Sequence, residues 1–327
     1  MSIFDLNFSF EEARVVIIPA PWDVTTSYGG GASRGPELIV KASSQIDHFS
    51  TDLPNLEQHK YHILSIPSEI LEESKGLRLK AQKVFSGESQ PEVITEINEA
   101  SDRFNDWVKE KTQMIIAAQK IPIVLGGDHS VPYGAIHAIA NEYKNEYALL
   151  HFDAHHDLRE NYMGFTHSHA SIMYNVMNSS CSPKRLVQVG IRDYCKEEFE
   201  FAMSRPEIKV YYDDDLNADL HSGYNWDSVC DKIIASTKKK NLYISFDIDG
   251  LDPKLCPNTG TPVPGGLDFA QVKTLFRKIK ESGKRIIGAD LVEVSPGNNE
   301  NMDNEWDGNV GMRVLFELCK LATLTNK

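Results

Sequence analysis

The sequence feature that most restricts this chain is Asp-Ala-His-His-Asp at residues 153–157, directly after the apolar residues 148–152. In an extended strand side chains alternate between faces, so Asp153, His155 and Asp157 project to the same side. Two carboxylates and an imidazole at one strand end are costly to bury without a compensating charge. A divalent metal ion would supply that charge, and the motif therefore predicts a metal site.

Two other apolar runs end in residues of the same chemistry. Residues 121–125 lead into Gly-Gly-Asp-His-Ser at 126–130, and residues 243–246 lead into Asp-Ile-Asp at 247–249. Taken singly, the second motif could be a turn and Asp128 a helix cap. The carboxyl ends of parallel strands, however, meet at one edge of an α/β sheet, where binding sites form. Three strand ends then offer six candidate metal ligands: His129, Asp153, His155, Asp157, Asp247 and Asp249.

The six candidates comprise four carboxylates and two imidazoles, without a thiolate. Oxygen-rich sites suit Mg2+, Ca2+ or Mn2+, and the imidazoles favour Mn2+, with Fe, Co, Ni or Zn as alternatives. Four aspartates exceed what one ion needs, whereas two divalent ions would neutralise them. Two ions about 3.5–4 Å apart can activate a shared water. The expected reaction is therefore hydrolysis at an electrophilic carbon or phosphorus.

Composition narrows the class of protein. The chain has 327 residues and a net charge of -13, which argues against a nucleic-acid partner because phosphate binding needs a basic face. The same charge is compatible with a cationic substrate. The five cysteines are widely spaced and are expected to be reduced. Neither a secretory signal nor a segment long enough to span a membrane is evident, so a cytoplasmic protein is expected.

Short apolar runs alternate with helix-like segments along the chain. Several runs are continuous, as in parallel strands that are buried on both faces. Strands are expected at residues 14–19, 121–125, 147–152, 186–191, 208–212, 242–248 and 285–294. Helices are expected from Pro36, over 91–119 and over 269–282. The pattern predicts one α/β domain over residues 1–327, with helices on both faces and a surface elaboration at about 47–90.

At the three strand ends the chain resembles the ureohydrolase (arginase–agmatinase) family. Residues 126–130, 153–157 and 245–253 match the family's three signatures in order, and the likeness extends from about Val15 to Leu321. The resemblance implies a central, mostly parallel sheet of about eight strands. It also implies a homo-oligomer, trimeric or hexameric, that uses two Mn2+ per chain to hydrolyse a guanidinium group to urea and an amine.

The resemblance assigns roles to the candidate residues. His129 and Asp157 would hold the first metal, His155 and Asp249 the second, and Asp153 and Asp247 would bridge both. Glu293 matches the family's guanidinium-binding glutamate. That role suits a carboxylate, which can hold a planar guanidinium by paired, charge-assisted hydrogen bonds.

The histidines outside the ligand set are expected to differ in role. A proton shuttle is implied on the loop after residue 157, and Ser-His-Ala at 168–170 matches the agmatinase-like pattern. His169 is therefore preferred over His167 as the residue that passes protons on from Asp157. His151 has the parity of Asp153 but lies one pleat deeper, which indicates support of a ligand or a core role. His156 faces the other way and is expected to be structural.

Several loops indicate the substrate class. Residues 157–170 look agmatinase-like and lack the Asn- and Thr-rich loop with which arginases hold the amino-acid head group; residues 19–36 and 256–267 also match agmatinases. The leading substrate is agmatine, giving putrescine and urea in polyamine biosynthesis. Alternatives are aminopropylagmatine, guanidinobutyrate, arginine and formiminoglutamate.

Two rivals belong to other classes: a catalytically silent homologue that serves as a binding or regulatory subunit, and a metal-dependent deacetylase, which the six-ligand set disfavours. The chain departs from the family pattern at residues 297–307 and is longer at 47–119. Either departure could reshape the pocket mouth or the contacts between subunits.

Overall fold

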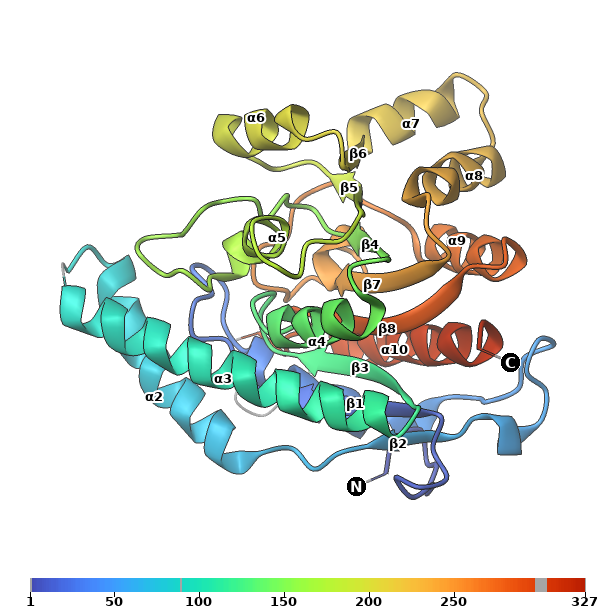
Figure 1. Cartoon of the computed structure of the whole chain (residues 1–327), viewed down its shortest axis with the longest axis horizontal. Helices are drawn as coiled ribbons and strands as arrows, with labels where there is room; N and C mark the ends of the chain where they lie inside the picture. Colours follow the sequence, from blue (N-terminus) through green and yellow to red (C-terminus); the bar gives the residue numbers. More distant parts are fainter. Residues whose placement is uncertain (1, 89, 298–304, 327) are drawn as a thin grey trace.

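Eight parallel strands form the central sheet of the computed structural model, which describes residues 2–88, 90–297 and 305–326 (Figure 1). Their order in the sheet is β2-β1-β3-β8-β7-β4-β5-β6. The strands are β1 (Val15–Ala20), β2 (Tyr61–Ile63), β3 (Ile121–Gly126), β4 (Ala148–Phe152), β5 (Arg185–Ile191), β6 (Ile208–Tyr212), β7 (Asn241–Asp247) and β8 (Arg285–Val292). The predicted α/β class and the sheet of about eight strands are confirmed.

Both faces of the sheet are buried, which explains the continuous apolar runs. In β1, Val15 and Ile17 belong to one hydrophobic core, whereas Val16 and Ile18 belong to another on the opposite face. In β3, Ile123 and Val124 divide between the two cores in the same way. Successive side chains of these strands therefore still point to opposite faces of the sheet, but both faces are buried and both need apolar residues.

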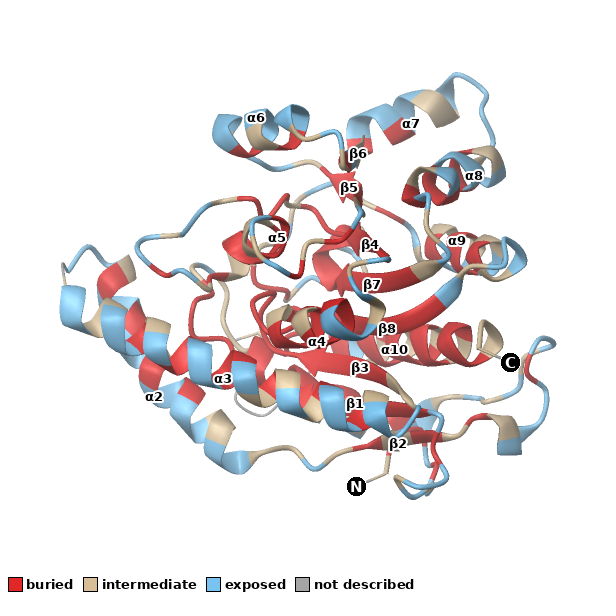
Figure 2. Ribbon diagram, viewed as in Figure 1, coloured by how far each residue is buried: buried red, intermediate tan, exposed pale blue. Residues whose placement is uncertain are grey.

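Helices cover the two faces as separate layers. One layer holds α1 (Gly35–Ala42), α7 (Asp213–His221), α8 (Trp226–Thr237), α9 (Phe269–Glu281) and α10 (Glu305–Leu324). The other holds α2 (Ser68–Phe85), α3 (Pro91–Ala117), α4 (Tyr133–Tyr143), α5 (Ile172–Met177) and α6 (Lys196–Ser204). Figure 2 shows that the helices bury mainly the sides that face the sheet or one another. No described helix combines the length and apolarity that a membrane span requires.

The seven predicted strands are present, with ends that differ from the prediction by at most two residues. The strand predicted at 285–294 ends at Val292, because Glu293 adopts the left-handed backbone conformation with φ of 62°. The segment 47–90 contains β2 and the 18-residue helix α2, neither of which was predicted. Most of the divergent segment 297–307 lies outside the described residues.

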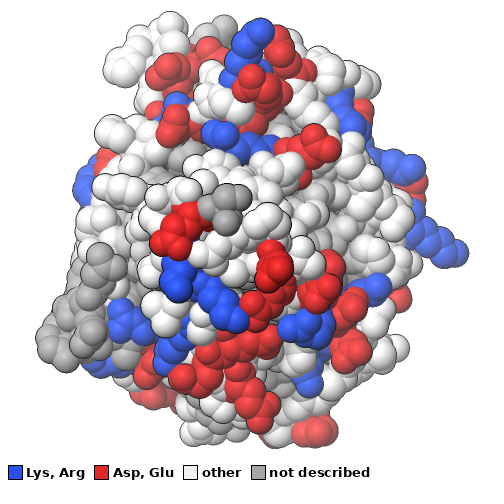
Figure 3. All heavy atoms as spheres, turned by 90° about the vertical axis from the view of Figure 1, so that its left-hand side faces the viewer, with Lys and Arg blue, Asp and Glu red and all other residues white. Residues whose placement is uncertain are grey.

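The strands run toward the left-hand side of Figure 1, and the C-terminus lies at the opposite end of the sheet. Figure 3 views that left-hand side, on which acidic and basic side chains are intermixed.

Candidate metal centre

The six predicted ligands converge at the carboxyl ends of β3, β4 and β7. His129 follows β3 in a tight turn, where a Cβ on Gly127 would lie 1.9 Å from the carbonyl oxygen of Trp22. Asp247 is the last residue of β7, and Asp249 lies in the following 3-10 helix, Ile248–Gly250. Five of the six ligands are buried; the exception, His155, is partly exposed.

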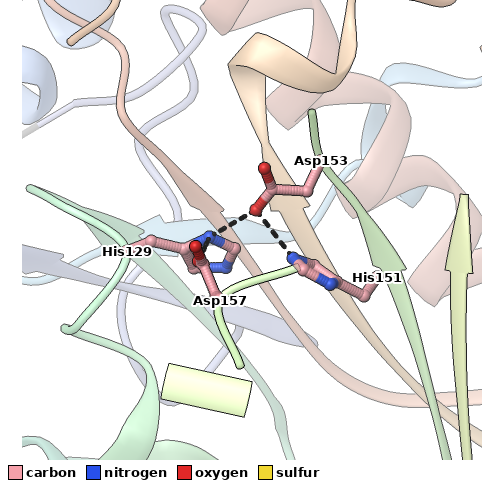
Figure 4. A group of neighbouring side chains, drawn as sticks. All are labelled: His129, His151, Asp153 and Asp157. Carbon is pink, nitrogen blue, oxygen red and sulfur yellow. Dashed lines mark hydrogen bonds and ion pairs between the residues drawn. The ribbon is translucent and has the colours of Figure 1, made fainter. Parts of the chain in front are cut away.

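Three carboxylate oxygens surround Nδ1 of His129. The nearest oxygens of Asp153, Asp157 and Asp247 lie 2.9, 3.0 and 3.2 Å from it. Figure 4 shows His129 and Asp157 close to the carboxylate of Asp153. Although it is buried, Nδ1 has no hydrogen-bond partner among the described residues.

A second group forms around His155. Its Nδ1 lies 3.1 Å from Oδ2 of Asp249 and 3.3 Å from Oδ1 of Asp153. Since Oδ2 of Asp153 faces His129, the two oxygens of this carboxylate face different histidines. Asp153 therefore joins two candidate metal sites into one cluster.

Hydrogen bonds fix the tautomer of His129. Ser245 donates its hydroxyl to Asp290 at 2.9 Å, so the Ser245 oxygen accepts from Nε2 of His129, also at 2.9 Å. A neutral His129 then presents the lone pair of Nδ1 to the three carboxylates. Burial alone would lower the pKa of His129, but these carboxylates raise it well above its ordinary value. Only a proton or a metal cation can satisfy this atom.

The charge of the cluster also calls for cations. Burial raises the pKa of Asp157 to about 7, and burial together with Asp249 and Asp153 raises that of Asp247 well above its usual range. Such shifts indicate carboxylates that lack sufficient positive charge around them. Two divalent ions would supply it, and the imidazole and carboxylate donors suit such ions.

A buried hydrogen-bond chain supports the cluster from the side of β5. His151 Nε2 lies 2.8 Å from Oδ2 of Asp153, and its Nδ1 accepts from the amide of Gln188 at 2.9 Å. The amide oxygen of Gln188 in turn accepts from Nδ1 of His156 at 2.8 Å. His151 therefore donates to Asp153 and orients it, while His156 acts through Gln188. The sequence indicated a supporting role for His151 but gave no signal for Gln188.

Glu293 lies directly beside the cluster. Its Oε1 accepts the backbone N–H of His129 at 2.9 Å, whereas the buried Oε2 has no hydrogen-bond partner in the part of the chain that the structure describes. Burial, together with the nearby carboxylates of Asp128 and Asp249, raises the pKa of Glu293 well above its usual range. An unsatisfied buried carboxylate oxygen is a ready acceptor for a cationic N–H donor.

The two candidate shuttle histidines have different surroundings. His169 lies 3.3 Å from Ser27 through Nε2 and lines a cavity of about 210 Å3 together with His155 and Asp157. Burial, followed by repulsion from His155, lowers the pKa of His169 to about 3, so its ring is neutral. His167 points instead to Asp102 of α3, at 3.0 Å, and does not line the cavity.

The cavity leads from the cluster to the surface. The remaining lining residues are Ser27, Arg159, Tyr162, Ala170, Asp193, Tyr194, Glu198 and Thr261. Ser27, Asp193, Tyr194, Glu198 and Thr261 were not singled out from the sequence. Arg159 lies 3.6 Å from the buried Glu198 and over the ring of Tyr162, so a carboxylate compensates its charge. Asp193, by contrast, keeps 68% of its side chain exposed.

Residues 13–319 match the Arginase family. The chain belongs to the arginase family of ureohydrolases. It is 33% identical over 287 residues to an N(1)-aminopropylagmatine ureohydrolase of Thermus thermophilus, a match covering 88% of this chain and 84% of the relative. It is 31% identical to an agmatinase of Bacillus cereus, with 88% and 86% covered.

Solved structures give the same fold. The proclavaminate amidino hydrolase from Streptomyces clavuligerus superposes with a TM-score of 0.76 at 23% identity, covering 99% of this chain and 97% of that one. Membership of the arginase family makes the chain an amidinohydrolase, which acts on C–N bonds of linear amidines. Members of this family use a binuclear metal centre, and the orphaned Nδ1 of His129 among three carboxylates fits one.

Proposed function

We propose that this ureohydrolase converts agmatine to putrescine and urea with two Mn2+ ions per chain. The observation that carries the guanidinium assignment is the buried, unpartnered Oε2 of Glu293 beside the ligand cluster. A trimeric or hexameric assembly in the cytoplasm completes the proposal and rests on the family resemblance alone.

In the proposed arrangement, His129 and Asp157 would hold one ion, His155 and Asp249 would hold the other, and Asp153 and Asp247 would be shared between them. When bound, such a pair of ions supplies an activated water and stabilises the charge that develops at the attacked carbon. The two oxygens of Asp153 face different histidines, which supports a shared role for this carboxylate. Asp247 directs Oδ2 toward His129, while its Oδ1 accepts the N–H of Asp249.

The chain's own residues would orient the substrate and move its protons. Glu293 would accept guanidinium N–H groups through Oε2 and so place the reacting carbon against the cluster. Asp157 would take up a proton, and the neutral ring of His169 would carry it through Nε2 toward the leaving amine. Both side chains line the same cavity, which supports this route.

The tail of the substrate would lie toward the mouth of the cavity. Asp193 is exposed there; its Oδ2 lies 3.9 Å from Nε2 of His155, and it has no arginine or lysine partner among the described residues, whereas Arg159 already faces Glu198. The mouth therefore favours an ammonium over a carboxylate. Aminopropylagmatine is the second candidate, because relatives carrying that name are among the most similar in sequence.

A urea-release screen of the Mn-loaded protein tests the proposal. The panel comprises agmatine, aminopropylagmatine, arginine, guanidinobutyrate, formiminoglutamate and free guanidine. We expect kcat/KM for agmatine to exceed that for arginine by at least about a hundredfold, or about 2.7 kcal/mol. A higher kcat/KM for aminopropylagmatine than for agmatine would make aminopropylagmatine the preferred substrate. Comparable kcat/KM values for arginine and agmatine would contradict the assignment. If none of the tested compounds yields urea, the result would favour a catalytically silent homologue.

A matched pair of substrates isolates the tail. Butylguanidine has the alkyl chain of agmatine without its terminal amine. The Asp193→Asn variant should raise KM for agmatine about fivefold or more while leaving that for butylguanidine unchanged, because only agmatine loses a charge partner. If the variant changes KM equally for both substrates, Asp193 does not recognise the tail.

A further inference from the structure

Cations gather at the end of the sheet opposite the metal centre. Four neighbouring strands, in the order β1, β3, β8 and β7, each begin beside a basic residue. The residues are Arg14 before β1, Lys120 before β3, Lys284 and Arg285 at the start of β8, and Lys240 before β7. With neighbouring strands about 4.8 Å apart, the row spans about 15 Å.

These residues line a large cavity. It has a volume of about 890 Å3, and its described lining includes six basic residues but one carboxylate, Glu142. The sixth cation, Lys280, is paired with Asp52 at 3.0 Å. In a chain whose net charge is -13, such a concentration of positive charge in one concavity is unusual. Its size is within the range of small-molecule pockets.

The cations of the row are held in place by neutral groups rather than by carboxylates. Lys120 donates to the carbonyl of Ala13 at 2.7 Å and Lys284 to that of Lys239 at 2.6 Å. Among the described residues, none of the five forms an ion pair with an aspartate or glutamate. No described carboxylate therefore compensates their positive charge. Burial lowers the pKa of Lys284.

The two arginines share an anchor from the far end of the chain. Arg14 donates to the backbone carbonyl of Asn326 at 3.5 Å, and Arg285 donates to its side-chain oxygen at 2.6 Å. Asn326 is itself held by hydrogen bonds to Ile286 and Ala322. Each guanidinium thus keeps N–H donors for a ligand while its position is fixed.

We propose that this cavity binds a small anion bearing several phosphoryl groups, with its oxygens along the row of strand starts. Guanidinium groups match phosphate oxygens in pairs, and lysines add point charges. Three or more negative charges are needed to compensate the row. Free oligophosphate and the triphosphate of a nucleotide share this chemistry; for a nucleotide, the base would lie toward Tyr143 and Leu324, which line the same cavity.

Calorimetric titration of the full chain with sodium tripolyphosphate and, separately, with ATP tests the proposal. We expect saturable binding of one anion per chain that weakens as salt is raised. The double variant Arg14→Gln/Arg285→Gln should bind at least about tenfold more weakly, since two charge-assisted contacts are lost. ATP binding about tenfold tighter than tripolyphosphate would identify a nucleotide, and equal binding would identify the oligophosphate group alone.

Two further variants keep the test decisive. Lys83→Gln/Lys196→Gln removes the same charge from helices outside the cavity and should change affinity by less than about twofold. Lys240→Glu, at a side chain with no bond among the described residues, should weaken binding even if the arginine variant does not fold. Oligophosphates also bind divalent ions, so parent and variants are titrated in one buffer. Absence of saturable binding, or equal binding by parent and cavity variants, would overturn the proposal.

Discussion

Nδ1 of His129 lies 2.9 Å from Oδ2 of Asp153, and both side chains are almost fully buried. The other ring nitrogen of His129 is already engaged by Ser245, so the ring cannot turn away without losing that bond. The protein thus holds a nitrogen lone pair against carboxylate oxygens. This arrangement persists only if a proton or a metal ion lies between them.

Because the two oxygens of Asp153 face different histidines, removing this side chain should affect metal content and activity more than removing a ligand of one candidate site. Asp153→Ala should lose both ions and lower kcat/KM by at least about a thousandfold, or about 4 kcal/mol, because both candidate sites lose a ligand. Asp249→Ala should keep the ion near His129 and retain more metal. Asp247→Ala, which removes the other proposed bridge, should cost more activity than Asp249→Ala. Metal content measured by mass spectrometry gives the ranking, and equal metal loss in all three would contradict it.

The contrast between the two loop histidines predicts their kinetics. His169→Ala should lower kcat by about a hundredfold or more, as expected for loss of a general acid–base group, while metal content stays unchanged. His167→Ala is the matched control, since His167 contacts Asp102 outside the cavity, and should leave kcat within about twofold. The reverse ranking would transfer the shuttle role to His167.

The raised pKa of Asp157 predicts how metal stabilisation depends on pH. With a folded pKa of about 7, Asp157 in the metal-free protein keeps a proton that the unfolded chain releases near pH 4, so the stability of that form falls between those values. A bound ion must displace this proton. The free energy of unfolding gained on adding Mn2+ should therefore grow by up to about 1.4 kcal/mol per pH unit below pH 7 and then level off, so the increase in Tm should be larger at pH 8 than at pH 6. An increase that is the same at both pH values would contradict the assignment.

The hydrogen-bond chain through Gln188 predicts an effect on metal affinity at a distance. Gln188→Met removes the donor to His151 and should weaken metal binding by about tenfold to a hundredfold, as for groups that orient ligands. Ser101→Ala changes another buried polar side chain, which lies on α3 without a hydrogen-bond partner among the residues described, and should leave metal affinity unchanged. Calorimetric titration of metal-free protein measures both variants. If Gln188→Met binds the metal as tightly as the parent protein, the hydrogen bonds through Gln188 have only a structural role.

Much of the fold follows from local patterns. Seven strands were evident because strands buried on both faces need uninterrupted apolar residues. β2 was missed because it has three residues and lies at the sheet edge, where one neighbour suffices. Helix α2 was missed because its polar face is broad and its buried residues, such as Leu77 and Ala81, are few.

The site likewise contains residues that the sequence predicted and residues that it did not. The ligands lie at strand ends, so their proximity could be predicted from parallel topology. The supporting partners could not, because they depend on register between strands distant in sequence. His151 is paired with Ser245, and Ser245 with Asp290, across β4, β7 and β8. Side chains that line the mouth, such as Asp193 and Ser27, come from loops whose paths only the folded chain reveals.

The most direct test of a binuclear ureohydrolase is a titration of metal-free protein with Mn2+ while urea release from agmatine is followed. Activity should rise until two equivalents per chain are bound and then level off. Full activity at one equivalent, or no urea at two, would contradict the account.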